Sequence, residues 1–190
     1  MRIIAGEAKG RTLFAPPGME TRPTSDKLRG SLFNILGGRV DDARVLDLFG
    51  GSGALALEAL SRGAAFAVVA DASRQAIQAI ERNARNVLKD DFDRRIRILR
   101  SDYRSAIAAL PGGEYDLVFL DPPYRMVEAY GDALARLAAA GRLSADCTAV
   151  LERLKTAELP MPEGFERVDT RVYGETAVDF VRLTPDARRL

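Results

Sequence analysis

The 190-residue sequence contains no histidine and a single cysteine, Cys147. Without histidine, the chain has no histidine general base, no Ser-His-Asp triad and no histidine ligand for a metal. One cysteine allows neither an intrachain disulfide nor a cysteine zinc site, and its apolar neighbours predict a small core residue. Any catalysis therefore depends on carboxylates, tyrosine, lysine, backbone groups or a cofactor, and we expect no metal.

Long apolar runs are also missing. No stretch approaches the roughly 20 residues that cross a bilayer, and no secretory signal precedes the first structural segment. We therefore expect a cytoplasmic protein with no membrane partner. The length favours one domain with room for a small appendage, and the 47% hydrophobic content is ordinary for a globular chain with a full core.

The chain has almost no excess of either charge, since the net charge is +1, so the whole molecule is not a polycation. The first thirty residues differ, with an excess of three positive charges from Arg2, Lys9, Arg11, Arg22, Lys27 and Arg29 against Glu7, Glu20 and Asp26. A basic lobe on a neutral body fits a nucleic-acid contact. An ordinary solvated surface explains so small an excess equally well.

Strand-like and helix-like segments alternate along the chain. An N-terminal hairpin is expected within residues 1–14, and helical spacing then runs from Leu28 to Leu36 and stops at Gly37-Gly38. Further strands are expected at 44–48, 66–70, 96–99, 115–120 and 148–151, and further helices at 53–63, 73–88, 104–110 and 127–140. A Gly174-Glu175 turn between residues 165–173 and 176–183 predicts a C-terminal hairpin.

This alternation predicts an α/β fold with right-handed βαβ units and a mostly parallel sheet. We expect residues 1–40 to form an extension of hairpin and helix, and residues 41–190 to form the main domain. Ligands of such sheets bind at the carboxyl ends of the strands. An acidic residue occupies each of these ends: Asp47, Asp71, Asp102, Asp121 and Glu152.

A glycine loop follows the first strand of the main domain. Residues 51–56 match G-x-G-x-x-A between a strand and a helix, and Asp71 lies twenty residues beyond Gly51. That spacing suits a carboxylate that accepts ribose hydroxyls of a nucleotide-containing cofactor. The alternative is a tight strand–helix turn in which the glycines serve only geometry.

Asp47 favours one cofactor over another, because a carboxylate just before the loop would repel a pyrophosphate. The same carboxylate would favour the positively charged ammonium and sulfonium groups of S-adenosylmethionine. Asp47 therefore favours S-adenosylmethionine over NAD as the cofactor. Asp102 at the end of the third strand can accept the adenine amino group, with the backbone N–H of Tyr103 beside it. Asp102 would equally serve as the N-cap of the following helix.

The most informative segment is Asp-Leu-Val-Phe-Leu-Asp-Pro-Pro-Tyr, residues 116–124. Two prolines end a buried strand and leave a carboxylate, a proline carbonyl and an aromatic face at its end. These groups suit a planar base with an exocyclic amino group, so the segment predicts methyl transfer to an amino nitrogen. Alternatively, Asp121-Pro122 opens an ordinary turn and Tyr124 is a core aromatic.

Together these motifs resemble the class I S-adenosylmethionine-dependent amino-methyltransferases. More specific segments resemble the bacterial RsmD family over nearly the whole chain: Met1 to Gly6, Lys9-Gly10-Arg11, Thr21-Arg22-Pro23-Thr24, Leu32 to Leu36, and Leu57 to Ala64. The resemblance implies methylation of guanine N2 in 16S ribosomal RNA, within a small ribosomal subunit or an assembly intermediate. It also implies the Rossmann-like, doubly wound, mostly parallel seven-stranded sheet of class I methyltransferases, with a C-terminal antiparallel hairpin.

The expected catalytic residues are Asp121, Pro122, Pro123 and Tyr124. The Asp121 carboxylate and the Pro122 carbonyl would each accept one amino N–H, and Tyr124 would stack on a base unstacked from the RNA. The expected cofactor-binding residues are Asp47, Phe49, Gly51, Ser52, Gly53, Asp71, Ala72, Asp102 and Tyr103, with Arg22 and Thr24 closing the site unless they only form a loop and helix entry. The expected RNA contacts are Lys9, Arg11, Arg22 and Lys27.

Two positions depart from the RsmD pattern. Arg29-Gly30 stands where the family usually has Arg-Glu, which removes a charge near the presumed RNA side, and Asp71 replaces a longer Glu. Three alternative functions stay open. They are an amino-methyltransferase for DNA adenine N6 or cytosine N4, a nicotinamide-dependent oxidoreductase, and a noncatalytic RNA-binding assembly factor.

Overall fold

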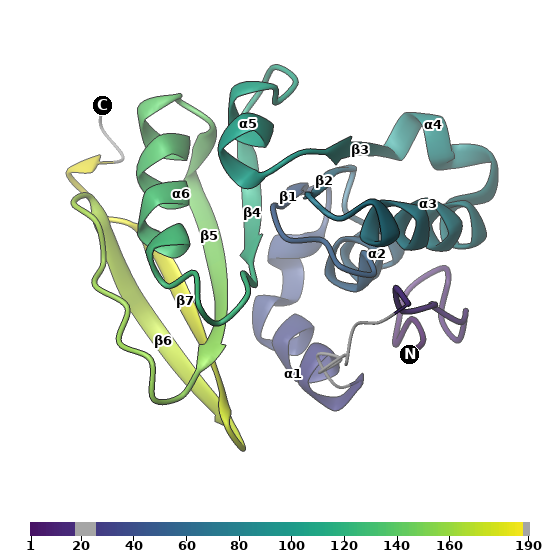
Figure 1. Ribbon diagram of the computed structural model, residues 1–190, viewed down its shortest axis with the longest axis horizontal. Helices are drawn as coiled ribbons and strands as arrows, with labels where there is room; N and C mark the ends of the chain where they lie inside the picture. The colour runs from purple at the N-terminus through teal and green to yellow at the C-terminus, as the bar shows by residue number, and fades with distance from the viewer. Residues whose placement is uncertain (18–25, 188–190) are drawn as a thin grey trace.

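The computed structural model describes residues 1–17 and 26–187, which contain one seven-stranded sheet with helices on both faces (Figure 1). The strands are β1 (Arg44–Asp47), β2 (Phe66–Asp71), β3 (Ile96–Arg100), β4 (Tyr115–Leu120), β5 (Leu143–Leu154), β6 (Phe165–Tyr173) and β7 (Thr176–Leu183). Their order is β3-β2-β1-β4-β5-β7-β6, and only β7 and β6 pair antiparallel to their neighbours. The predicted doubly wound fold is therefore confirmed.

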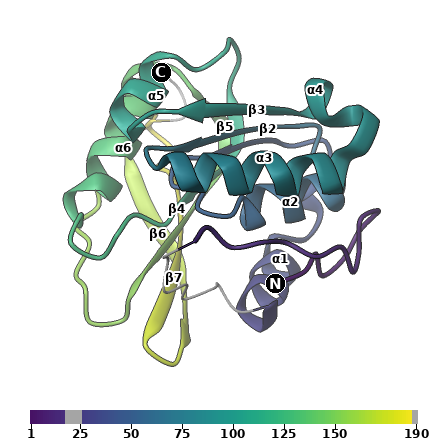
Figure 2. The ribbon, with the colours of Figure 1, turned by 45° about the vertical axis from the view of Figure 1, so that its right-hand side comes forward.

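Two layers of helices cover the sheet. One face carries α1 (Asp26–Leu36), α2 (Ala54–Ser61) and α3 (Arg74–Leu88), and the other carries α5 (Tyr103–Ala108) and α6 (Glu128–Ala139). Figure 2 shows α2 and α3 side by side in front of the strands. Successive β1 residues divide between the layers, since Val45 packs with the first group and Leu46 with the second. The central strands are therefore apolar on both sides, as buried parallel strands require.

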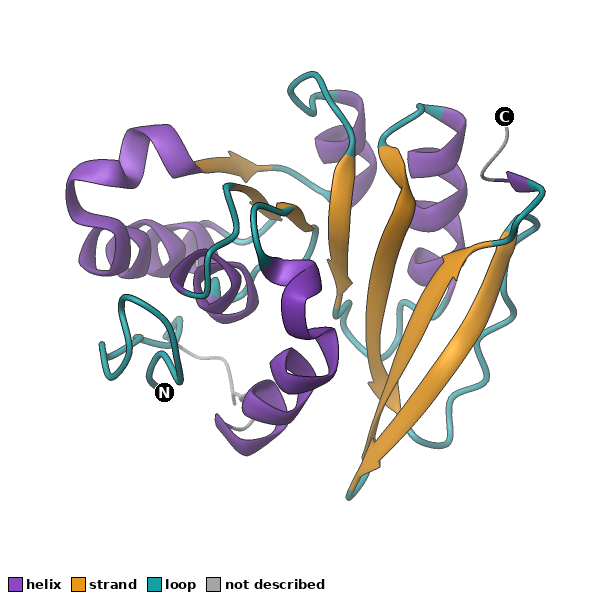
Figure 3. Cartoon of the chain, turned by 180° about the vertical axis from the view of Figure 1, so that it is seen from behind, coloured by secondary structure: helices purple, strands orange, loops and turns teal. Residues whose placement is uncertain are grey.

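Most element boundaries agree with the sequence pattern, and the fifth strand is the main exception. It was expected at residues 148–151 but runs from Leu143 to Leu154, because pairing with β7 extends it at its end and pairing of Leu143 with Tyr115 extends it at its start. The C-terminal hairpin has the predicted limits and projects along one edge of the sheet (Figure 3). Three short helices were not predicted: η1 (Gly37–Val40), η2 (Lys89–Asp91) and α4 (Phe92–Arg95).

The N-terminal lobe, residues 1–17, forms the expected hairpin only in reduced form. One antiparallel bridge joins Arg2 to Thr12, and the Leu13 N–H donates to the Met1 carbonyl at 2.9 Å. The paired segments are too short to be strands, so this lobe depends on contacts with the body of the protein.

Cys147 in β5 is a buried core residue, as predicted.

Glu58 on α2 supplies the main anchor of this lobe. Its carboxylate accepts the backbone N–H groups of Ile4 at 2.8 Å and Ala5 at 3.0 Å. It also pairs with Arg29 at 3.4 Å and with Arg62 at 2.8 Å, and both Glu58 and Arg29 are fully buried. Arg29 therefore serves the packing of the lobe, and its charge, counted among the basic residues of the first thirty, is not presented to solvent.

Candidate active site

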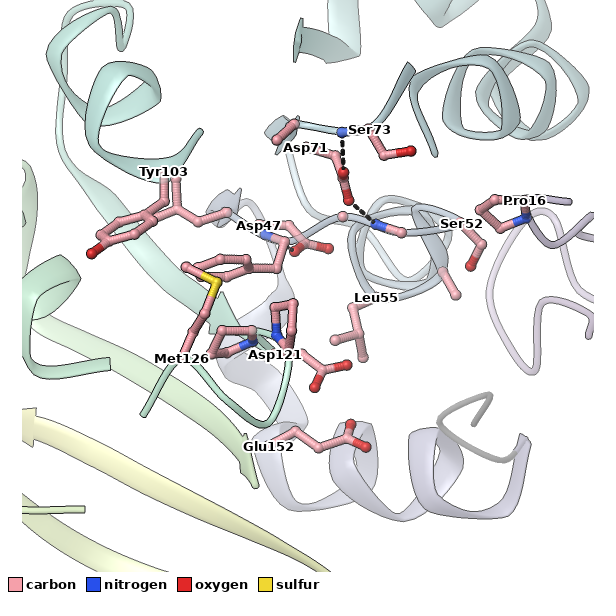
Figure 4. Close-up of a pocket in the computed structure, with 18 of the residues that line it drawn as sticks. Pro16, Asp47, Ser52, Leu55, Asp71, Ser73, Tyr103, Asp121, Met126 and Glu152 are labelled. Carbon is pink, nitrogen blue, oxygen red and sulfur yellow. Dashed lines mark hydrogen bonds between the residues drawn. The ribbon is translucent and has the colours of Figure 1, made fainter. Parts of the chain in front are cut away.

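A cavity of about 1110 Å³ opens at the carboxyl edge of the parallel strands (Figure 4). Its walls come from the carboxyl ends of β1 to β4 and the segments that follow them, and from Glu152 within β5, with Met1 and Pro16 added from the N-terminal lobe. The predicted site residues that line it are Asp47, Phe49, Gly51, Ser52, Asp71, Ala72, Asp102, Tyr103, Asp121, Pro122, Pro123 and Tyr124. The topology thus brings nearly all of the predicted cofactor and catalytic residues together.

The glycine loop gives the cavity a wall of bare backbone. Gly51 has a φ of +54°, and a Cβ on it would meet no atom within 4 Å, so its missing side chain leaves open space. Gly53 is not one of the residues that line the cavity. It is the N-cap of α2 and has a left-handed backbone conformation. Gly50 packs inward, where a Cβ would lie 2.4 Å from Val69. The loop therefore combines close packing with an open approach to its backbone.

Asp71 is hydrogen-bonded to the loop that it faces. One carboxylate oxygen accepts the Gly51 N–H at 2.9 Å, and the other accepts the Ser73 N–H at 2.8 Å (Figure 4). Both bonds fix the direction of the carboxylate at the cavity wall. Each oxygen keeps a second lone pair, so a ribose hydroxyl can still be accepted.

Asp47 is a buried carboxylate at the floor of the cavity, 2% exposed. Burial is the main cause that raises its pKa to about 7; a hydrogen bond from the Phe49 N–H opposes this shift, and the nearby charge of Asp71 adds a smaller upward contribution. A carboxylate with so unfavourable an environment is stabilised by a cation.

An aromatic pair lines the cavity where β1 and β3 end. Phe49 and Tyr103 lie with ring centroids 5.5 Å apart, and the Tyr103 hydroxyl donates to Asp132 at 2.7 Å. Asp102 is the N-cap of α5 and accepts the N–H groups of Arg104 and Ser105. Of the two interpretations of Asp102, the helix cap is therefore confirmed. The contact with adenine stays a prediction.

The Asp-Pro-Pro-Tyr segment forms the opposite wall. Pro122 is buried, and the Pro123 carbonyl accepts the Met126 N–H at 2.8 Å, which turns the chain toward α6. Tyr124 is 42% exposed, so it is not a core aromatic. Its side chain lies at the rim of the cavity.

Asp121 is half-buried among other carboxylates. Burial raises its pKa well above the ordinary value, and the charges of Glu152 and then Asp47 raise it further. Glu152 was noticed at the end of its strand but was not included among the site residues. The regular placement of acidic residues at strand ends was the signal that could have included it.

The predicted RNA contacts fall into three groups. Lys9 and Lys27 are exposed. Arg11 instead donates to the carbonyls of Asn86 and Val87 at the end of α3, at 3.0 Å for Val87, so its charge caps that helix. Arg22, expected at both the cofactor and the RNA, lies outside the described residues, as does Thr24, which was expected only at the cofactor.

Residues 1–17 and 26–187 contain no group of three or more acidic or cysteine side chains placed to hold a metal ion. Within the same residues, no helix is long and apolar enough to cross a membrane.

The groups that line the cavity are those that S-adenosylmethionine requires. It combines a buried carboxylate for an ammonium group, a second carboxylate held toward the loop for a ribose, an aromatic pair for adenine, and open space over Gly51. A pyrophosphate would meet Asp47 and Asp71 without a cation on the described walls. The cavity is also large enough to admit a second planar group beside Asp121.

Comparison with known proteins gives the family. A family model described as "Conserved hypothetical protein 95" matches residues 1–182. The chain belongs to this family. A Bacillus subtilis relative named "Putative rRNA methyltransferase YlbH" is 37% identical over 182 residues, which cover 94% of this chain and 96% of the relative. The predicted resemblance is confirmed, and the chain is an RsmD-like methyltransferase of the class I superfamily.

Two comparisons with Escherichia coli extend this result, one with a curated sequence and one with a solved structure. "Ribosomal RNA small subunit methyltransferase D" is 40% identical over 125 residues, which cover 66% of the RsmD-like chain and 61% of that relative. The solved structure titled "Putative methyltransferase yhhF from Escherichia coli" has a TM-score of 0.81 at 31% identity, covering 96% of this chain and 97% of the other. The fold that carries the cavity is thus shared with this solved structure.

Proposed function

We propose that this RsmD-like chain methylates the exocyclic N2 amino group of a guanine in 16S ribosomal RNA and uses S-adenosylmethionine. The observation that carries the proposal is the meeting of Asp121-Pro122-Pro123-Tyr124 with Asp47, Asp71 and the glycine loop in one cavity. The names of the Bacillus subtilis and Escherichia coli relatives support ribosomal RNA as the acceptor. The choice of guanine N2 rests on the family resemblance.

The cofactor-binding half of the cavity uses groups that the fold holds in place. Asp47 pairs with the ammonium group of the methionine moiety, because a buried carboxylate gains most from a cation. Asp71, fixed by its bonds to Gly51 and Ser73, accepts the ribose hydroxyls. Phe49 and Tyr103 form the apolar wall for adenine.

The catalytic half orients the acceptor nitrogen. S-adenosylmethionine supplies a methyl group on a sulfonium that is already activated for transfer. Guanine N2 is a poor nucleophile, because its lone pair is delocalised into the ring. Asp121 and the Pro122 carbonyl each accept one N–H of this amino group and draw the nitrogen toward tetrahedral geometry, while Tyr124 stacks on the base. Positioning of this kind contributes most of the acceleration.

The proton balance assigns a second role to Asp121. The nitrogen gains a methyl group and loses one proton, and the nearest carboxylate accepts that proton. The raised pKa of Asp121 suits it to this step, since a carboxylate of ordinary pKa is a weak base near neutral pH.

The N-terminal lobe presents the RNA to this cavity. Met1 and Pro16 reach the cavity wall, and the exposed Lys9 on the same lobe and Lys27 on α1 can contact phosphates. The target base must leave its stack to reach Asp121. We expect the substrate to be a small ribosomal subunit or an assembly intermediate in the cytoplasm.

Methyl transfer from labelled S-adenosylmethionine tests the proposal. The acceptors are small ribosomal subunits lacking the modification, free 16S RNA and duplex DNA, with Asp121→Ala as the inactive variant. We expect label in ribosomal RNA, a loss of turnover by roughly 10²-fold or more in the variant, and unchanged binding of S-adenosylhomocysteine. Label in DNA alone, or full activity of Asp121→Ala, would exclude the proposal.

A further inference from the structure

Glu152 lies beside Asp121 at the edge of the sheet. Leu120 of β4 and Leu151 of β5 are paired in parallel register. The residues that come next, Asp121 just beyond β4 and Glu152 within β5, are therefore also neighbours. Adjacent strands lie about 4.8 Å apart, and register partners point to the same side of a sheet. Figure 4 shows the two carboxylates pointing toward each other in the cavity.

The backbone of Glu152 is held on several sides. It pairs with Val178 of β7, and its carbonyl accepts the Tyr130 hydroxyl at 2.5 Å. The next residue, Arg153, forms a buried ion pair with Asp179 at 2.7 Å. Glu152 itself is only 7% exposed, so its carboxylate is presented to the cavity by a rigid strand.

Two neighbouring carboxylates in a buried site repel each other, and ligand N–H groups that bridge them relieve the repulsion. The three bases with amino groups differ in what they can offer. Guanine places the N1–H donor directly beside its N2 amino group. Adenine and cytosine place an unprotonated ring nitrogen beside theirs, which is an acceptor and would face a carboxylate.

We infer that Glu152 accepts the N1–H of the target guanine and so selects guanine over adenine and cytosine. This inference rests on the proposed function, because it requires the amino group of the base at Asp121. Asp121 and Pro122 then bind the reacting amino group, and Glu152 reads the ring nitrogen next to it. The site recognises a base by two adjacent donor positions on one edge.

The experiment compares two acceptors that share the reacting amino group. Small ribosomal subunits are reconstituted around 16S RNA that carries either guanosine or 2-aminopurine riboside at the mapped acceptor position. The base 2-aminopurine keeps the amino group at C2 but has an unprotonated N1. The proteins are the wild-type chain, Glu152→Gln, and Glu158→Gln as a matched control at an exposed carboxylate of the connection between β5 and β6.

The wild-type chain and Glu158→Gln should methylate guanosine far more efficiently than 2-aminopurine riboside. In Glu152→Gln the amide can donate to an unprotonated N1, so we expect the ratio of the two kcat/KM values to fall by roughly ten- to a hundredfold. Binding of S-adenosylhomocysteine and the melting temperature should match those of the wild type.

An unchanged ratio in Glu152→Gln would overturn the inference and leave the proposed function intact. This holds also when both kcat/KM values fall equally, because an equal loss on the two acceptors indicates a general structural role of Glu152. Failure of the wild-type chain to label guanosine subunits would instead remove the proposed function and the inference together.

Discussion

The side chain of Asn83 on α3 hydrogen-bonds both backbone groups of Phe14. Its Oδ1 accepts the Phe14 N–H at 2.8 Å, and its Nδ2 donates to the Phe14 carbonyl at 2.8 Å. The same Nδ2 donates to the carbonyl of Ser52 at 2.8 Å. One fully buried amide therefore joins the N-terminal lobe to the glycine loop of the cofactor site.

Replacement of Asn83 by Ala should loosen both attachments. We expect the free energy of unfolding to fall by about 1–3 kcal/mol, because buried backbone groups lose their partners. Affinity for S-adenosylhomocysteine should fall as well, since Ser52 loses its anchor. Chemical denaturation and calorimetric titration measure the two effects.

Asn86→Ala is the matched control for that prediction. Asn86 lies one turn further along α3 and donates to the Thr12 carbonyl at 3.0 Å, but it is exposed. Its loss should change stability by no more than about 0.5 kcal/mol. Equal effects of the two substitutions would contradict the coupling through Asn83.

Cofactor binding should release protons near neutral pH. Asp47 has a pKa of about 7 because it is buried, so about half of the free protein carries a proton there at pH 7. An ammonium group beside it lowers this pKa, and the proton leaves on binding. Titration with S-adenosylhomocysteine in buffers of different ionisation enthalpy should therefore show proton release and an affinity that rises from pH 6 to pH 8.

The same carboxyl links pH to the stability of the protein without cofactor. Its folded-state pKa is raised, so it stabilises the folded state at acid pH, and this contribution is lost as the pH rises through about 7.

Asp47→Asn is the control variant for the proton release on cofactor binding. It should abolish this release while keeping the shape of the side chain. Proton release of the wild-type size in Asp47→Asn would contradict the assignment.

Glu58→Gln should destabilise the N-terminal lobe more than any surface change. Arg29 would keep its charge in a fully buried position without its only fully buried carboxylate partner among the described residues, Glu58 at 3.4 Å, and would retain only the more exposed Asp26 at 3.0 Å. We expect a loss of about 3–5 kcal/mol in the free energy of unfolding. Urea denaturation measures it, with the exposed Glu81→Gln on α3 as the control. A loss below about 1 kcal/mol would show that Glu58 is not the anchor.

Charge reversal at Lys9 and Lys27 should weaken RNA binding without changing affinity for S-adenosylhomocysteine. If each contacts one phosphate, the slope of log affinity against log salt should decrease in magnitude by about two units in the double variant. Filter binding to small ribosomal subunits over a range of salt gives this slope. Arg39→Glu is the control, because Arg39 is exposed on η1 beyond the other end of α1. The same decrease in that control would indicate nonspecific charge effects.

The sequence was most informative where structure is determined locally. Pro122-Pro123 ends β4 at Leu120, and Gly174-Glu175 sets the turn of the C-terminal hairpin, so both boundaries were predicted correctly. The start of β5 at Leu143 was not predicted, because it depends on pairing with Tyr115 rather than on local pattern.

The same distinction applies to the cavity. The topology of a parallel sheet places strand-end carboxylates together, which is why Asp47, Asp71 and Asp121 could be located in advance. Side-chain partners depend on tertiary packing, which the pattern does not contain. The bond between Asp71 and the glycine loop, the capping of α3 by Arg11 and the burial of Arg29 therefore became visible only in the structure.

The central claim is the identity of the methylated atom, and nucleoside analysis tests it most directly. Small ribosomal subunits lacking the modification are incubated with the protein and labelled S-adenosylmethionine, and their RNA is digested to nucleosides and separated. We expect all of the label in N2-methylguanosine and none when Asp121→Ala is used. Label in N6-methyladenosine, in N4-methylcytidine or on a ribose would contradict the assignment of Asp121 and Pro122 to guanine N2.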